Sequence, residues 1–580
     1  MLNAEIADIF EAIADLLDLK GENRFRIVAY RRAGQTLRDL SEPVEAVAGR
    51  DELTSLPGIG KDLAQKIRDY IATGRIEQYE KLKAEVPPGL TDLLRVPGLG
   101  PKTLALIHQE LGVGSAEDLR AVIEDGRLLS LPGVQEKTVE NIRKGLEFIA
   151  ASGGRRLLGE VLAPVQEILS AVRKIPGVRR AEPAGSLRRM AETIGDVDLL
   201  ASLKPPAEGK DVVRAFTELA QVNEVLARGE TKGSVRLGDN LQVDLRVVPE
   251  GDYGSALQYF TGSKAHNVKV RGLARQKGLK INEYGVFRGK KKLAGRTEKE
   301  VYSALGLAYV EPELREDRGE VEAAQEGKPL NGNLPKLVRV SDLRGELHVH
   351  TEWSDGEGNL REVALRAKAA GYEYVALTDH SVSERVARGL SADRLRRQME
   401  QIDALNREGL GIRILKGAEV DILGKGELDY PDDLLMGLEV VIAAVHSGFK
   451  QSADRMAGRI LDALDHPAVH ILAHPTGRLI NAREPYAVDL ERVMAKAAER
   501  GVALEVNGSH QRLDLSDVHA RRALELGASL CLSTDAHRLE AIGGIELAVA
   551  QARRAWARKL DVLNTKTSSK LLEWLGTRRK

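Results

Sequence analysis

The sequence is nearly free of cysteine, with Cys531 alone among its 580 residues. A single thiol excludes internal disulfides and cysteine-type zinc sites. Apolar runs are also short: none approaches the roughly 20 residues that a membrane span needs, and the amino terminus carries no apolar signal segment. These absences predict a cytoplasmic protein that makes no membrane contact.

Net charge is absent as well, because 86 Lys and Arg residues balance 86 Asp and Glu residues. A chain of 580 residues is expected to contain several domains, so charge has to be considered region by region. Residues 264–299 contain 12 Lys or Arg against two acids, Glu283 and Glu298. A surface that only confers solubility usually carries both signs. This stretch therefore predicts contact with a polyanion such as nucleic acid.

Histidine is concentrated at the carboxyl end, where residues 346–580 hold ten of the twelve in the chain. Helical stretches there separate seven short apolar runs, which predicts βα units around a parallel, barrel-like sheet. Catalytic groups in such barrels lie at the carboxyl ends of the strands. The runs are residues 346–350, 374–380, 412–419, 440–446, 469–474, 502–507 and 529–537.

Six of these seven runs end in His, Asp or Glu, the exception being the run that ends at Asn507. One such histidine would usually be an ordinary buried residue satisfied by hydrogen bonds. Nine polar groups at one barrel mouth would be costly to bury without a cation, so they predict a metal cluster. Imidazole and carboxylate without thiolate suit Mn²⁺, Zn²⁺ or Fe²⁺. The nine are His348, His350, Asp355, His380, Glu419, His446, His474, Asp535 and His537.

Near the amino end, a Pro-Gly-apolar-Gly pattern precedes two predicted helices. Gly58 and Gly60 form the first copy, Gly98 and Gly100 with Lys102 form the second, and residues 131–135 form a third with Gln135 in place of the last glycine. Two glycines allow a tight turn whose backbone N–H groups meet a phosphate. A lone copy would be an ordinary turn. Three copies match the helix-hairpin-helix motif, which grips the DNA backbone.

A group of carboxylates is predicted in the middle of the chain. Asp196 and Asp198 are two apart in a strand-like run and therefore point to one face. Asp244, in the run 241–247, offers a third carboxylate from a neighbouring strand. Three clustered carboxylates cannot all stay ionised without cations, and such oxygen ligands suit Mg²⁺ or Mn²⁺ beside substrate phosphates. Ser186 and Arg189, upstream, would meet a triphosphate.

These motifs occur in a recognisable order. The series G-S-L-R-R (185–189), G-D-V-D (195–198), V-D-L-R (243–246) and Y-F-T-G-S (259–263) resembles a family X DNA polymerase of the beta type. The H-V-H, T-D-H, G-A-E, A-V-H, A-H-P and T-D-A-H series that follows is similar to the PHP phosphoesterase domain. Together they resemble the bacterial PolX architecture over essentially the whole chain.

The resemblance implies a multidomain fold: an all-α helix-hairpin-helix region, an α+β nucleotidyltransferase palm and thumb, and a distorted (β/α)7 PHP barrel. The expected boundaries follow the motifs. They are a helical DNA-binding domain (1–84), a fingers-like helical domain (85–150), the palm (151–249), the thumb (250–312), an acidic linker (313–344) and the PHP domain (345–580).

The resemblance also assigns roles to residues of this sequence. Asp196, Asp198 and Asp244 would be the catalytic metal ligands of the polymerase. The incoming nucleotide would contact Ser186, Arg189, Gly195, Tyr259, Phe260, Gly262, Lys264 and Asn267. DNA would contact Gly58, Gly60, Gly98, Gly100, Lys102 and Arg271. Three ions would lie in the PHP domain, held by His348, His350, Glu419 and Asp535, by Glu419, His446 and His474, and by Asp355, His380 and His537.

Three positions qualify the resemblance. Gln242 stands where an arginine near the third aspartate often occurs, and Lys264 where an aspartate often lies beside the base. Lys66 matches the family's Schiff-base lysine, which acts as the lyase nucleophile only if its pKa is depressed. The alternative role for Lys66 is a phosphate contact.

The resulting hypothesis is a monomeric gap-filling repair polymerase that uses dNTPs on gapped or nicked DNA. Its PHP domain would supply a 3′→5′ exonuclease, with cleavage at abasic sites as a further activity of the same centre. A pure nuclease and a non-enzymatic DNA-end scaffold are the alternatives. The intact carboxylates argue against the first, and the full ligand sets in both centres argue against the second.

Overall fold

A computed structural model describes residues 2–20, 22–38, 44–86, 88–93, 96, 99–140, 142, 143, 146, 155–238, 241–325 and 334–577. The chain divides into two compact units, Met1–Gly154 and Arg155–Lys580. Among the helices of the described residues, none is long and apolar enough to cross a membrane.

The first unit is entirely helical within its described residues and encloses one apolar core. The turns of the hairpin motifs have the predicted form. Gly58 has a φ of +80°, which favours glycine, and the apolar residues Ile59 and Leu99 between the paired glycines are buried. Gly98 lies outside the described residues. The main helices are α1 (Leu2–Leu19), α2 (Arg24–Arg38), α3 (Val44–Gly49), α4 (Lys61–Thr73), α5 (Glu77–Glu85), α6 (Pro88–Leu93), α7 (Pro101–Leu111) and α8 (Ala116–Glu124).

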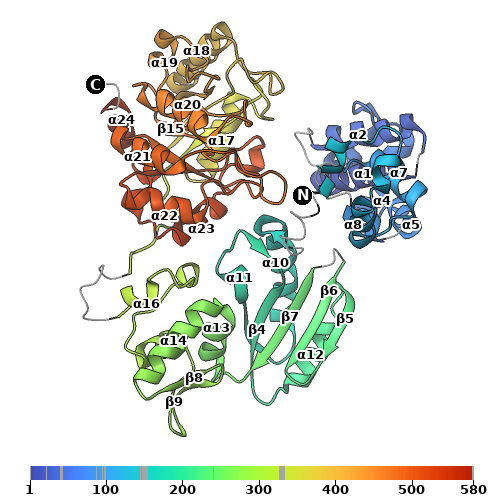
Figure 1. The fold of residues 1–580 in the computed structure, drawn as a ribbon, viewed down its shortest axis with the longest axis vertical. Coiled ribbons are helices and arrows are strands. Elements are labelled where there is room, and N and C mark those ends of the chain that lie inside the picture. Colours follow the sequence, from blue (N-terminus) through green and yellow to red (C-terminus); the bar gives the residue numbers. More distant parts are fainter. Residues whose placement is uncertain are drawn as a thin grey trace. The chain divides into compact units, whose positions relative to one another are not determined.

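The second unit begins with a five-stranded mixed sheet of strand order β2-β4-β7-β6-β5. Helices α10 (Leu158–Lys174) and α12 (Gly209–Thr217) pack into one core with this sheet, as Figure 1 shows. The short helix α11 (Gly185–Arg188) lies between β2 and β4 in the sequence. The strands are β2 (Val178–Pro183), β4 (Val197–Leu203), β5 (Val222–Arg228), β6 (Lys232–Leu237) and β7 (Gln242–Val248), with β1 (Arg156–Leu157) and β3 (Thr193–Ile194) in a separate pair.

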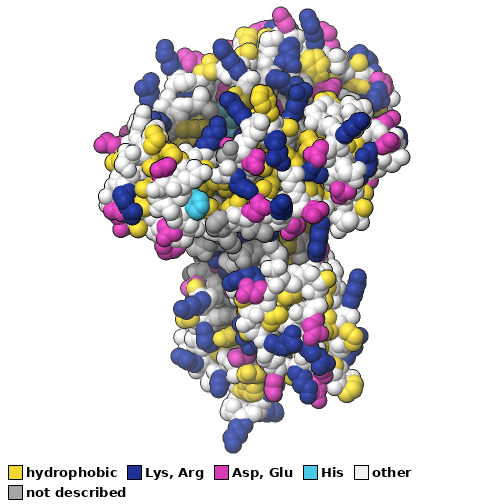
Figure 2. Space-filling view, turned by 90° about the vertical axis from the view of Figure 1, so that its right-hand side faces the viewer, with side chains coloured by type: hydrophobic (Ala, Val, Ile, Leu, Met, Phe, Trp, Pro, Cys, Tyr) yellow, Lys and Arg dark blue, Asp and Glu magenta, His cyan; other side chains and the backbone are white. Residues whose placement is uncertain are grey.

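The next region has its own small core and a three-stranded antiparallel sheet. The hairpin of its last two strands forms a tip that ends in basic side chains (Figures 1 and 2). Part of the segment expected as a linker packs here, because Arg315 and Glu320 are fully buried. The elements are α13 (Tyr253–Thr261), α14 (Lys264–Gln276), β8 (Lys280–Asn282), β9 (Gly285–Arg288), β10 (Lys291–Ala294), α15 (Glu298–Ala304) and α16 (Glu320–Ala323).

The carboxyl region is the predicted seven-stranded parallel barrel, and each predicted apolar run forms one strand. Consecutive strands pair in order, and a parallel bridge between Val349 and Ala536 joins the last strand to the first. The strands are β11 (Gly345–Val349), β12 (Tyr374–Leu377), β13 (Arg413–Asp421), β14 (Val440–Ala444), β15 (Ile471–Leu472), β16 (Ala503–Asn507) and β17 (Leu530–Ser533). The helices are α17 (Leu360–Ala369), α18 (Ala392–Glu408), α19 (Asp432–Gly437), α20 (Ala453–Asp465), α21 (Leu490–Arg500), α22 (Asp517–Glu525), α23 (Glu546–Arg554) and α24 (Ser568–Thr577).

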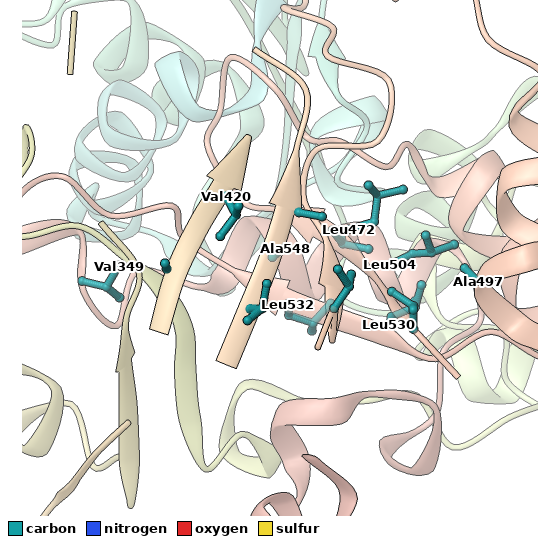
Figure 3. Packing of buried hydrophobic residues seen from close by; sticks show 14 of the residues in the cluster. Val349, Val420, Leu472, Ala497, Leu504, Leu530, Leu532 and Ala548 are labelled. Carbon is teal, nitrogen blue, oxygen red and sulfur yellow. The ribbon is translucent and has the colours of Figure 1, made fainter. Parts of the chain in front are cut away.

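The barrel strands consist of continuous apolar runs because an apolar cluster packs on each face of the sheet. Outward-facing residues such as Val420, Leu504 and Leu532 pack in one cluster with the surrounding helices (Figure 3). Inward-facing residues such as Ile442 and Cys531 form a second cluster. Burial on both faces removes the usual polar alternation. Most of the polar side chains lie at the strand ends, and buried Glu346 and Glu505 are exceptions inside β11 and β16.

Candidate metal centres and nucleotide site

The nine predicted ligand residues of the barrel converge around the carboxylate of Glu419. Its oxygens lie 2.9 Å from His380 Nδ1 and 2.9 Å from His474 Nε2. Three further histidine Nε2 atoms lie at 3.3 Å (His446), 3.4 Å (His348) and 3.6 Å (His350). Glu419 lies in β13, which pairs with β12 on one side and β14 on the other.

Eight of the nine residues, all but His474, contribute to three groups whose ligand atoms lie within 4.8 Å of one another. One group joins His350 to the predicted trio of Asp355, His380 and His537, and a second contains His348, His350 and Asp535. The third brings Glu419 and His446 together with His380, whereas the sequence placed His474 there. A fourth group, Glu384, Asp421 and His446, was not foreseen.

Several buried atoms in this cluster have no hydrogen-bond partner within the described residues: His348 Nε2, both ring nitrogens of His350, His380 Nδ1, Glu419 Oε2 and His474 Nδ1. A buried unpaired polar atom is costly, and so many at one point are rare in proteins. Divalent cations would pair all of them. The donor set therefore fits the predicted metals.

The surroundings lower the pKa of one histidine of the cluster and raise the pKa of another. Burial, together with the neighbouring rings of His537 and His380, lowers the pKa of His350 to about 3, so this ring is neutral and able to bind a metal. Burial opposes protonation of His446, but Glu419 and Asp421 outweigh it and raise its pKa to about 10. Metal binding at His446 must therefore displace a proton.

The sequence did not predict the hydrogen bonds that surround this cluster of candidate ligands. Buried Glu505 accepts a hydrogen bond of 2.6 Å from His348 Nδ1 and one of 2.7 Å from the backbone N–H of His474. This arrangement turns His348 Nε2 toward the centre. Asn507, the one strand end without an acid or imidazole, donates to Asp535 Oδ2 at 3.0 Å. The available signal was a glutamate inside the otherwise apolar run 502–506, two residues before Asn507.

The buried carboxylate of Asp379, which follows β12, forms hydrogen bonds that hold the loop after β11. Its carboxylate accepts hydrogen bonds from the backbone N–H and hydroxyl of Thr351 and from Gln398. The loop residues between His350 and Asp355 are thereby held in place.

Replacing Glu505 with glutamine is expected to weaken Mn²⁺ binding to the barrel by about ten- to a hundredfold, because the amide supports the His348 tautomer less well. Calorimetric titration of the metal-free protein measures this. Glu499→Gln, at an exposed position on α21, is the matched control. Equal affinities for the Glu505 variant and the native protein would show that Glu505 does not orient a ligand.

The three predicted carboxylates of the first sheet also come together. Strands β4 and β7 run parallel with Asp198 directly opposite Asp244, and Asp196 immediately precedes β4. Burial and the charges of Asp196 and Asp244 raise the pKa of Asp198 to about 6. A proton and a cation therefore compete for this carboxylate near that pH.

Asp244 is held by two side chains of the same sheet. Lys232 Nζ lies 2.7 Å from its Oδ2, and Gln242 Nε2 donates to its Oδ1 at 3.1 Å. Despite burial, these contacts lower the pKa of Asp244. Gln242 thus supports Asp244 directly, and Lys232 is a neighbour that the sequence reasoning did not identify.

The predicted nucleotide residues surround the junction of α11 and α13. Arg189 Nη1 donates to the backbone carbonyl of Thr261 at 2.6 Å, next to Gly262. Asn267 Nδ2 donates to the carbonyl of Tyr259 at 2.7 Å. Ser186 lies in α11, Phe260 stacks edge-on against Tyr259, Gly195 is exposed just before Asp196, and Lys264 and Arg271 lie on α14.

The remaining predictions fall in the first unit. Gly60 directly precedes α4, and Gly100 directly precedes α7. Lys102 lies in the first turn of α7. Lys66 is on α4, where its Nζ lies 2.5 Å from Asp62.

Comparison with known proteins relates each region to a family. Residues 1–76 match the helix-hairpin-helix domain, 90–147 the SAM-like helix-hairpin-helix tandem, 256–316 the DNA polymerase beta thumb and 346–509 the PHP domain. A DNA polymerase/3′-5′ exonuclease PolX of Bacillus subtilis is 38% identical over 98% of both chains. The chain belongs to the PolX family.

Two more distant relatives each match only a part of this chain. A DNA polymerase lambda of Rattus norvegicus is 27% identical and matches 54% of this chain and 56% of its own length. A probable phosphatase of Syntrophotalea carbinolica is 30% identical and matches 39% of this chain and 89% of its own length. Family X polymerases act on DNA and dNTPs, and the polymerase and PHP domains of PolX proteins use divalent metals.

Gly185 of this PolX chain approaches the carboxylates so closely that a side chain would disturb them. It has a φ of +61°, and an added Cβ would lie 2.4 Å from Asp198 Oδ2. Because misplacing a catalytic group by about 1 Å costs roughly a hundredfold in rate, Gly185→Ala is expected to slow primer extension about a hundredfold. Gly238→Ala, at a position with open space around it, is the control. Normal extension by the Gly185 variant would separate Asp198 from the chemistry.

Proposed function

We propose that this chain is a family X DNA polymerase that fills short gaps during DNA repair and carries a metal-dependent 3′→5′ exonuclease in its barrel. The observation that supports this best is the coexistence of two separate sets of ligands in one chain. One is the in-register pair Asp198 and Asp244 with Asp196. The other is the cluster around Glu419.

In the polymerase centre, Asp196, Asp198 and Asp244 would hold two Mg²⁺ or Mn²⁺ ions, which supply activation of the primer 3′-hydroxyl and neutralise charge on the leaving pyrophosphate. Ser186, Arg189 and Gly195 would receive the triphosphate. Tyr259, Phe260 and Gly262 would contact the sugar, while Lys264, Asn267 and Arg271 would face the base pair and template. The Arg189–Thr261 contact supports this grouping, because it joins the phosphate and sugar sides of the pocket.

In the barrel, the nine ligand residues would hold three Mn²⁺, Zn²⁺ or Fe²⁺ ions, which supply a hydroxide at neutral pH and stabilise charge on the phosphate. Glu419 would be shared between ions, as its contacts with five histidines suggest. Cleavage at abasic sites would use the same centre.

The substrate would be gapped or nicked DNA bound by a monomer. The hairpin turns at Gly58, Gly60, Gly98, Gly100 and Lys102 would grip the backbone, and the basic tip of the β9–β10 hairpin would add charge. The six-part domain division given above remains our proposal for how these roles are distributed. Lys66 is proposed as a phosphate contact, because Asp62 pairs with it.

Incubation with a 5′-labelled gapped primer-template in Mn²⁺, with and without dNTPs, tests both centres. Extension with dNTPs and shortening without them are expected. Shortening alone would favour a pure nuclease whose polymerase fold only positions DNA. Neither activity, on a protein shown to bind the substrate, would favour a DNA-end scaffold.

A further inference from the structure

A helix of the PHP barrel reaches the nucleotide residue Arg189. The side chain of Arg554, the last residue of α23, is only 6% exposed. Its Nη1 donates to the backbone carbonyl of Arg189 at 2.7 Å and to Glu316 Oε1 at 2.9 Å. The same oxygen of Glu316 accepts a hydrogen bond of 3.0 Å from Arg189 Nε. Arg554 therefore contacts Arg189 both through its backbone and through a shared carboxylate.

Two of the five N–H donors of the Arg189 guanidinium are occupied by protein. Nε bonds to Glu316, and Nη1 bonds to the carbonyl of Thr261. Within the described residues, Nη2 has no hydrogen-bond partner, so both of its N–H groups are left for phosphate oxygens. A guanidinium fixed by two of its nitrogens loses less freedom on binding than a mobile one.

The charges at this junction also favour a polyanion. Three arginines, Arg189, Arg554 and Arg318, share the two carboxylates of Glu316 and Asp517, so one positive charge remains at the junction. Asp517 at the start of α22 lies 2.8 Å from Arg554 Nη2 and anchors the side chain in the barrel. The loop after Arg189 is held to the barrel as well, because Gln551 donates to the carbonyl of Met190 at 3.3 Å and Arg478 pairs with Glu192 at 2.5 Å.

We propose that Arg554 is a positioning residue for nucleotide binding: through Glu316 and the Arg189 carbonyl, a side chain of the nuclease domain presets the arginine that receives the triphosphate in the polymerase centre. The polymerase site is then incomplete without the barrel. This inference rests on the proposed role of Arg189 in the polymerase.

Steady-state primer extension by the full-length chain tests the proposal. Arg554→Ala is expected to raise the KM for dNTP about tenfold while kcat stays within about twofold, because charge-assisted contacts that set binding are lost and the carboxylate metal ligands are untouched. Arg554→Lys should recover part of the loss, since an ammonium can reach one acceptor but lacks the fork. Arg553→Ala is the matched control, because the neighbouring Arg553 pairs with Glu313 at 2.7 Å and not with Arg189.

A double substitution separates positioning from general damage to the fold. If Arg554 acts through Arg189, Arg554→Ala should change nothing further in an Arg189→Ala background. Exonuclease activity of Arg554→Ala should equal that of the native chain. An unchanged KM, an additive effect in the double variant, or a parallel loss of exonuclease activity would each overturn the proposal. Absence of extension by the native chain would instead refute the proposed polymerase function.

Discussion

Asp198→Ala is expected to slow primer extension by about a thousandfold or more while leaving exonuclease activity unchanged. Asp198 lies directly opposite Asp244 on the neighbouring parallel strand and close to Gly185 at the start of α11. Without it, two carboxylates would remain for two ions, and neither ion would be held at the primer end. Single-turnover incorporation of one dNTP measures the loss.

Asp211→Ala is the matched control for this experiment, because Asp211 is an exposed acid on α12 of the same sheet region. Shortening of a single-stranded 3′ end, measured on the same preparation, reports whether the barrel is intact. Extension that survives Asp198→Ala would remove the three aspartates from the catalytic assignment.

Glu419→Gln is expected to produce the reverse pattern, with exonuclease activity lower by about a thousandfold or more and primer extension unchanged. Five histidines contact this one carboxylate at 2.9–3.6 Å. The amide keeps the size of the side chain but removes the charge that would be shared between ions. Mass-spectrometric metal analysis after dialysis should show fewer bound ions than in the native chain.

Glu427→Gln, an exposed position after β13, serves as the control for Glu419. His350→Ala provides an independent second variant, because its ring belongs to two of the ligand groups. Full metal content with full exonuclease activity in both variants would mean that hydrolysis takes place elsewhere in the chain.

The barrel could be predicted from the sequence because its geometry leaves a strong mark on the chain. Strands buried on both faces need uninterrupted apolar residues, and a functional barrel places its polar residues where these runs stop. Asp198 and Asp244 could be paired for a similar reason, since each occurs as an acid inside an apolar strand.

The interactions that support the site could not be predicted in the same way. Glu505 contacts His348 across the barrel, and Arg554 reaches Arg189 from a different domain. Glu505 leaves only a single glutamate inside an apolar run, and Arg554 leaves no local pattern. In both cases the partner is far away in the sequence, so the sequence does not show which residue is contacted. Residues 313–325 show the same limit: their acidic composition predicts a linker, yet Arg315 and Glu320 are buried by partners that only the tertiary fold supplies.

Closure of the barrel ties the appearance of the proposed hydrolytic centre to the synthesis of β17 and the loop that follows it. The parallel bridge between Val349 and Ala536 brings Asp535 beside His350, with 3.2 Å between their nearest side-chain atoms. A ribosome that has made only β11 to β16 has therefore produced histidines without the last carboxylate and without a closed mouth. The polymerase sheet precedes the barrel and can fold earlier, since domains form in order during translation. An unfinished copy that ends before β17 thus lacks Asp535 and His537, two members of the proposed hydrolytic centre.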